Sequence, residues 1–199
     1  MPSGRRHSVP RRGLDSGQVI DAAITIADRD GLEAVTLARV ADSLGIRAPS
    51  LYHHVAGHDG LLRAIALRGL SELTSALQSA ALGRSGTDAL TATAHAYRDY
   101  AHAHPGAYAA TVRAPAPGDI EHEQAGGAAI EVLAAVLREW RLEDEEMLHA
   151  VRVIRSALHG FVSLEASGGF ALPLDLDQSF ERLIGTLAAG LPATAQSGR

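Results

Sequence analysis

Apolar residues recur three and four positions apart through most of this chain, and that spacing constrains its fold more than any other feature. The first such stretch stops at Gly31, and its apolar face consists of Val19, Ile20, Ala23, Ile24, Ile26 and Ala27. Residues spaced in this way share one side of an α-helix, whereas a half-buried strand would alternate apolar and polar residues. Alanine dominates the apolar fraction and aromatic residues make up only 4% of the chain, which also favours helix over sheet. No segment has a convincing strand pattern, so the sequence predicts an all-α protein.

Glycine and proline residues divide the predicted helices. Asp15 or Ser16 can cap the first helix, and Thr36 can cap a short helix that stops at Gly45. Pro49 suits the first position of a third helix over residues 49–55, where its missing N–H costs little. A long fourth helix runs from the AGHDG break to Leu77. Further helices are expected at 87–104, 106–113, 121–141, 144–167 and 178–190, with loops at 82–86, 114–119 and 167–177.

The second and third helices, joined by a glycine turn, form a predicted helix-turn-helix. In that motif the N-terminal part of the second helix meets base edges in the DNA major groove. Leu51 and Val55 are four residues apart and are expected to face the core. The other face would then present polar and aromatic groups outward, namely Arg47, Ala48, Ser50, Tyr52, His53 and His54. Arginine can reach guanine or phosphate, hydroxyls can bond phosphate, and imidazoles can do either.

The motif lies in the string TLARVADSLGIRAPSLYHHVAGHDGLLRAI, which resembles the N-terminal domain of the tetracycline-repressor (TetR) family. The likeness covers about residues 16–66 and implies contact with a palindromic operator in double-stranded DNA. The candidate DNA-binding residues are Thr36, Arg47, Ala48, Pro49, Ser50, Tyr52, His53, His54 and His58. Two of them are weak ligands. Ala48 can offer only a methyl contact, and His58 stands where the family usually has a phosphate-binding lysine, so operator affinity is expected to be lower or to vary near about pH 6–7.

Residues 152–191 resemble the WHG-type regulatory domain found at the C-terminus of such regulators, although no tryptophan occupies an obvious position. The resemblance implies a homodimer formed through the helices at 144–167 and 178–190, and a small-molecule effector held between the long helices. Effector binding would then release a repressor from its operator. The large polar and aromatic side chains of this half are the candidate ligand-binding residues: Tyr97, Tyr100, Tyr108, Trp140, Arg152 and Arg155. Gly160 lies in mid-helix, which favours a close crossing between helices or between subunits over a ligand contact.

These features predict four regions. Residues 1–14 form a disordered basic tail, residues 15–58 a DNA-binding domain with its motif at about 36–55, residues 59–191 a regulatory and dimerisation domain, and residues 192–199 a second disordered tail. The first tail holds Arg5, Arg6, Arg11 and Arg12, while the whole chain has a net charge of −5. Charge therefore supports nucleic-acid binding only through that tail.

The remaining composition excludes several kinds of function. The chain has no cysteine, so disulfides, thiolate metal sites and thiol catalysis are ruled out. No apolar run approaches the roughly 18 residues of a membrane span, and the N-terminus lacks the apolar stretch of a secretion signal. We expect a soluble, cytoplasmic protein with no cofactor and no membrane partner.

Three alternatives remain open at this point. A helical enzyme or small-molecule carrier could contain a hairpin that only mimics the DNA motif, but no catalytic constellation or phosphate loop is recognisable. A nonspecific DNA-coating protein is disfavoured by the acidic second half. A metal site is disfavoured because His102 and His104 point to different faces of a helix, and no third ligand joins His95 and His102. The acids at 143–146 are expected to favour a helix N-terminus and not to act in catalysis.

Overall fold

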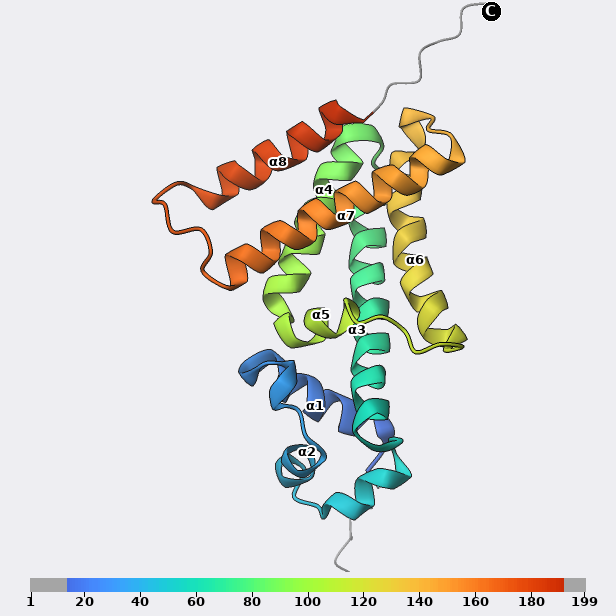
Figure 1. The fold of residues 1–199 in the computed structure, drawn as a ribbon, viewed down its shortest axis with the longest axis vertical. Helices are drawn as coiled ribbons and strands as arrows, with labels where there is room; N and C mark the ends of the chain where they lie inside the picture. Colours follow the sequence, from blue (N-terminus) through green and yellow to red (C-terminus); the bar gives the residue numbers. More distant parts are fainter. Residues whose placement is uncertain (1–13, 192–199) are drawn as a thin grey trace, which may run out of the picture.

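The computed structural model describes residues 14–191 and contains only helices, turns and loops within that range (Figure 1). The prediction of an all-α fold is confirmed. The predicted tails lie outside the described residues, apart from Leu14. None of the described helices combines the length and the apolar character that crossing a bilayer requires.

The first four helices form a small head, and the remaining ones form a larger body. The head contains α1 (Ser16–Asp30), η1 (Leu32–Ala34), α2 (Leu37–Ser43) and η2 (Ala48–His53), where η denotes a 3-10 helix. A long helix, α3 (Gly57–Ala81), leads into the body. The body continues with α4 (Gly86–Ala103), α5 (Pro105–Thr111), α6 (Ile120–Val136), η3 (Leu137–Trp140), α7 (Asp144–Ala166) and α8 (Leu176–Gly190).

The caps predicted for the first two α-helices are present. The Asp15 carboxylate accepts a hydrogen bond of 2.8 Å from the Gln18 backbone N–H, and the Gln18 side chain accepts one of 3.0 Å from the Asp15 N–H. This reciprocal pair satisfies two backbone donors that α1 itself cannot satisfy. The Thr36 hydroxyl accepts from the Arg39 N–H at 3.2 Å and starts α2 in the same way.

Two hydrophobic cores divide the protein, and α3 belongs to both. Its N-terminal half contributes Leu61 and Ile65 to the core of the head, together with buried side chains of α1, α2 and η2. Its C-terminal half contributes Leu73 and Leu77 to the core of the body, beside α4, α6, α7 and α8. Figure 1 shows α3 running vertically from the head into the body, so one rigid helix connects the two cores.

A second connection forms where α1 of the head meets α5 of the body. Asp28 Oδ1 accepts hydrogen bonds from the backbone N–H groups of Gly106 (2.8 Å) and Ala107 (3.0 Å). A Cβ atom on Gly106 would overlap the backbone of Ala27, so only glycine permits this approach. The head is therefore held to the body by a close helix contact as well as by the continuity of α3.

The polar contacts between α4 and the α7–α8 pair account for two of the histidines. Arg98 is buried between Glu165 and Asp177, with its guanidinium carbon 4.9 Å from the centre of the Phe180 ring. His102 bonds Glu165, whereas His95 bonds Glu181. These two imidazoles therefore bond different carboxylates and do not share one ligand.

Candidate functional site

The helix-turn-helix forms the end of the head that points away from the body (Figure 1). After α2, Gly45 takes a left-handed backbone conformation (φ 66°), which glycine adopts without strain. The Ile46 N–H then bonds the Ala41 carbonyl at 3.0 Å, and Ile46 packs against the core of the head. This turn redirects the chain so that Arg47 begins the second helix of the motif.

That second helix differs from the prediction, because residues Ala48–His53 form a 3-10 helix and not an α-helix over 49–55. Bonds between residues three apart hold it, from Ser50 N–H to Arg47 O (2.9 Å) and from His54 N–H to Leu51 O (2.8 Å). Pro49 supplies no backbone donor, and six residues allow few of the longer α-type bonds. Leu51 within the segment and Val55 just after it are both buried and hold this stretch of chain against the core of the head.

The predicted outward face of this segment is largely present. Leu51 is fully buried, whereas the next residue, Tyr52, is 64% exposed. Four further candidates are exposed on the same segment or at its start, namely Arg47, Pro49, Ser50 and His53. Arg29 and Arg39 pair with Asp30, whereas Arg47 has no carboxylate within 4 Å among residues 14–191. Its guanidinium is therefore not neutralised by a neighbour.

The other DNA candidates are partly engaged in the head itself. Ala48 and His54 are half-buried, and Ala48 packs against the core of the head. The Thr36 hydroxyl serves as the cap of α2. The imidazole Nε2 of His58 donates a hydrogen bond to the Val35 carbonyl at 2.9 Å, so only Nδ1 is left for another partner. These four positions shape the motif in addition to any contact they make with DNA.

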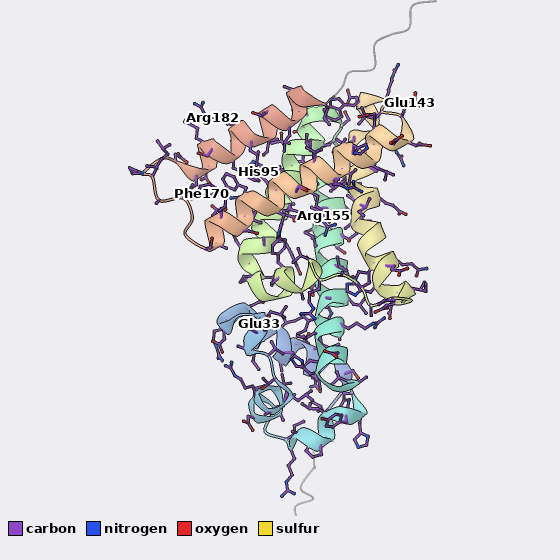
Figure 2. All side chains as sticks on the ribbon, viewed as in Figure 1. Glu33, His95, Glu143, Arg155, Phe170 and Arg182 are labelled. Carbon is purple, nitrogen blue, oxygen red and sulfur yellow. The ribbon has the colours of Figure 1, made fainter. Side chains whose placement is uncertain are left out.

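A cavity of about 490 Å³ lies in the body between α3, α4, α6 and α7. It brings together two of the six candidate ligand residues, Tyr97 of α4 and Arg155 of α7. A second hollow of about 490 Å³ shares Arg155 with the first and adds Arg152 and His159. Figure 2 shows Arg155 on α7 near the point where that helix crosses in front of α3.

Hydrogen bonds extend the polar wall of the cavity beyond Tyr97. The hydroxyls of Tyr97 and Tyr108 bond each other at 2.8 Å, and the Tyr108 hydroxyl lies 2.6 Å from His159 Nδ1. Burial raises the pKa of Tyr97 and of Tyr108 above the ordinary value of 10.0, so both phenols are neutral near pH 7. A neutral hydroxyl both donates and accepts, so this chain of bonds can run in either direction.

The last two candidates lie apart from this group. The Tyr100 hydroxyl donates to Glu72 Oε2 at 3.3 Å and so faces the side of α3. Trp140 packs against the body core from η3, the short helix that follows α6. The structure thus groups Tyr97, Tyr108, Arg152 and Arg155 and separates Tyr100 and Trp140 from them.

Several residues of the cavity were not among the sequence-based candidates. His122 is buried and lines the wall from α6, while Arg113 lies at the mouth in the loop before it. His122, Gly126 and Ile130 are four residues apart and all line the cavity. A histidine in register with the inward face of a helix was the signal in the sequence that could have identified His122. Arg113 offered no such signal, because it lies in a loop.

Two protein-family models match the chain. The model of bacterial regulatory proteins of the tetR family covers residues 19–65, which include the helix-turn-helix. The model of the tetracyclin repressor-like C-terminal domain covers residues 90–187, which include Tyr97 and Arg155.

Curated relatives match over almost the whole length. An uncharacterized HTH-type transcriptional regulator of Mycobacterium tuberculosis (strain ATCC 25618 / H37Rv) is 37% identical over 187 residues, covering 93% of this chain and 85% of the relative. Another, from Bacillus subtilis (strain 168), is 32% identical over 187 residues, covering 92% and 95%.

Solved structures show the same fold. A protein of unknown function from Rhodococcus sp. RHA1 superposes with a TM-score of 0.79 at 22% identity, covering 92% of this chain and 99% of the other. The Streptomyces coelicolor TetR family protein ActR, in complex with (S)-DNPA, gives a TM-score of 0.68 at 21% identity, covering 92% and 98%. From the two matching models and the full-length relatives, this chain belongs to the TetR family of bacterial transcriptional regulators.

Proposed function

We propose that this protein is a homodimeric repressor that binds a palindromic DNA operator and is released from it by a small-molecule effector. The observation that carries the proposal is the two-sided segment after Gly45. It buries Leu51 completely while exposing Tyr52, Ser50 and Arg47 at the tip of the head, and Arg47 pairs with no carboxylate of residues 14–191. Side chains of these kinds bond phosphates and base edges, and a helix-turn-helix presents them to the major groove.

The remaining DNA candidates contribute in different ways. His53 is exposed and can reach the phosphate backbone or a base. Pro49 and Ala48 offer apolar contact, and Thr36 and His54 border the same segment. His58 can present only Nδ1, since its Nε2 bonds Val35. We therefore expect Arg47, Ser50 and Tyr52 to dominate the contacts.

The outward face of α7 supports the dimer. One side of α7 enters the body core, while Val153 and Leu164, which share another side of the helix, are 57% and 49% exposed. Apolar side chains grouped on one exposed helix face are typical of a protein interface. We call residues 47–54, which contain η2, the recognition segment. Two copies of the protein related by a two-fold axis would place their recognition segments about 34–36 Å apart, which is one turn of DNA.

The cavity supports the response to an effector, and ActR was solved with a small molecule bound. A ligand that fits only one arrangement of the two heads shifts the population toward it. Lowering operator affinity a hundredfold requires about 2.7 kcal/mol of difference in ligand binding between the two states. This role needs no catalysis, so we propose a regulator without enzymatic activity, which acts in the cytoplasm where bacterial DNA lies.

Selection from random DNA tests the proposal. The purified full-length protein is mixed with random duplexes, and the bound fragments are amplified and sequenced over several rounds. We expect a palindrome whose half-sites are one helical turn apart, and gel-shift binding of that site should far exceed binding of scrambled DNA. Enrichment of no sequence, with equal affinity for all duplexes, would favour a nonspecific coating protein. Absence of DNA binding together with turnover of a small molecule would favour the enzyme alternative.

A further inference from the structure

The walls of the body cavity are mainly hydrocarbon. Leu70, Leu73 and Leu77 line it from α3, and Ile130 and Leu133 line it from the facing side of α6. The volume of about 490 Å³ falls within the range that holds a drug-sized molecule. Such walls stabilise a ligand chiefly by removing its apolar surface from water, so the body of the ligand should be apolar as well.

A pair of glycines widens the cavity on the α6 side. Gly126 and Gly127 both line it, and a Cβ atom built on either would meet no atom within 4 Å. Neither glycine is therefore required by a close helix contact with another part of residues 14–191. Glycine in the middle of a helix costs about 1 kcal/mol relative to alanine. Two adjacent positions that border the cavity therefore carry no side chain.

Among the charged groups around this apolar space, arginines outnumber the single acid, although the whole chain has a net charge of −5. Arg113 and Arg155 line the cavity, and Arg152 lines the adjoining hollow. None of the three has a carboxylate within 4 Å among residues 14–191, in contrast to Arg63 and Arg98, which are paired. One acid, Glu123 of α6, also lines the cavity. Three guanidiniums beside one carboxylate leave an excess of positive charge.

Arg155 lies between the two hollows and next to the end of the tyrosine chain. If His159 Nδ1–H donates to Tyr108 and Tyr108 donates to Tyr97, the Tyr97 hydroxyl can donate to a ligand. An anion beside Arg155 would favour this direction, because each donor then points toward the negative charge. Arginine and tyrosine together would hold a carboxylate by charge-assisted hydrogen bonds.

We propose that the effector is an apolar acid, whose hydrocarbon or aromatic body fills the space between α3 and α6 and whose carboxylate bonds Arg155 and Tyr97. The inference rests on the proposed function only in assuming that this ligand controls DNA binding. The preference for an acid is a property of the cavity and is measured without DNA.

Calorimetric titration of the full-length protein with matched pairs tests the proposal. The probes are octanoic acid with octanamide, and 2-naphthoic acid with 2-naphthamide, at neutral pH where the acids are ionised. We expect at least one acid to bind roughly tenfold or more tightly than its amide, since hydrogen bonds to charged groups are the stronger ones. A preference confined to one pair supports the proposal and identifies the body of the ligand as aliphatic or aromatic.

Two variants connect that preference to the cavity. Arg155→Met keeps an unbranched side chain and removes the charge. The acid should then bind no more tightly than its amide, while the affinity for the amide should change little. Gly127→Leu should fill the cavity and weaken the acid and the amide alike, and Gly127→Ala serves as the milder step. Arg182→Met on α8, which Figure 2 shows well apart from Arg155, is the matched control and should bind as the wild type does. Thermal unfolding checks that each variant is folded.

The proposal is overturned if no acid binds at millimolar concentration, if acid and amide bind equally, or if folded Arg155→Met keeps the preference. Failure of the DNA selection with the preference intact would remove the proposed function and leave the acid site. If an operator is found but the acid binds no better than its amide, the acid site is removed and the proposed DNA-binding function stands.

Discussion

Neighbouring residues of the recognition segment have opposite surroundings, and this contrast separates binding from folding. Leu51 is fully buried in the core of the head, whereas Tyr52 is 64% exposed. A substitution at Leu51 therefore removes packing, and one at Tyr52 removes only groups that face outward. The two positions form a matched pair for testing the interface.

We expect Tyr52→Ala to lower operator affinity roughly tenfold, because it removes a hydroxyl able to bond phosphate and an aromatic surface. The free energy of unfolding should change by no more than about 0.5 kcal/mol, as is usual for an exposed site. Leu51→Ala should instead lower stability by about 2–5 kcal/mol. Gel shifts and urea unfolding measure the two quantities, and unchanged affinity of Tyr52→Ala would contradict the assignment.

A substitution at Arg47 tests whether the recognition segment distinguishes one DNA sequence from another. If its guanidinium contacts a base edge, Arg47→Ala should reduce discrimination between operator and scrambled DNA by about 1–3 kcal/mol. Binding titrations at several salt concentrations, on both duplexes, measure this. If the variant binds both duplexes more weakly by the same factor, Arg47 contacts a phosphate instead. The slope of log affinity against log salt concentration should then fall by about one. Arg138→Ala, at an exposed position on η3 of the body, is the control.

At the level of helices, α6 is tied to α3 by an ion pair near the head. Asp119 caps α6 by accepting from the His122 N–H at 3.2 Å, and it also bonds the Arg63 guanidinium at 2.5 and 2.6 Å. His122, one turn further on, lines the cavity. A ligand that displaces α6 would therefore strain a contact close to the start of α3.

The same ion pair predicts a pH dependence. The Arg63 guanidinium lowers the pKa of Asp119 from 3.8 to about 2, so the carboxylate is charged over a wider range when the protein is folded. Its contribution to stability is complete above about pH 4 and is lost as the pH falls toward 2. Asp119→Asn should flatten the acid part of the stability profile. Hydrogen bonds to Arg29 and Arg39 also lower the pKa of Asp30, so the stability of Asp119→Asn should still decrease somewhat as the pH falls.

Urea unfolding between about pH 2 and pH 6 measures this effect. Glu121 bonds Arg63 as well, but its side chain is 71% exposed, so Glu121→Gln should alter the profile little. An Asp119→Asn profile parallel to that of the wild type would contradict the role given to the pair.

At the level of the whole molecule, the face of α7 turned away from the core is the proposed contact between subunits. Gly160 was predicted to permit a close crossing of helices. A Cβ atom there would meet no atom within 4 Å, so no such crossing occurs among residues 14–191 of one chain. Of the two crossings predicted for Gly160, the one between subunits is left and is favoured over a ligand contact, in keeping with the exposed apolar residues on the same helix.

Sedimentation of the purified protein should give the mass of two 20.8 kDa chains. Val153→Arg would place a charge in the proposed contact, and we expect it to yield monomers that bind the palindrome far more weakly, because one half-site is lost. Leu82→Arg is the control, since Leu82 is 81% exposed at the turn between α3 and α4. Dimers that persist in Val153→Arg would contradict the proposed interface.

The all-helical fold and the orientation of individual helices were predictable from the sequence. Apolar spacing predicted that Val19, Ala23 and Leu51 face inward, and all three are buried. Capping residues predicted where α1 and α2 begin, at Asp15 and Thr36. These features depend on side chains within one or two turns of each other, so the chain alone contains the information.

Only the tertiary structure decided which distant groups meet. It directed His58 Nε2 to Val35 and separated Tyr100 and Trp140 from the cavity. It also joined Tyr97 to Tyr108 and His159 and placed Arg155 and His122 around one apolar space. Each of these outcomes depends on how whole helices cross, and that geometry comes from the packing of two cores and not from the spacing within any one helix.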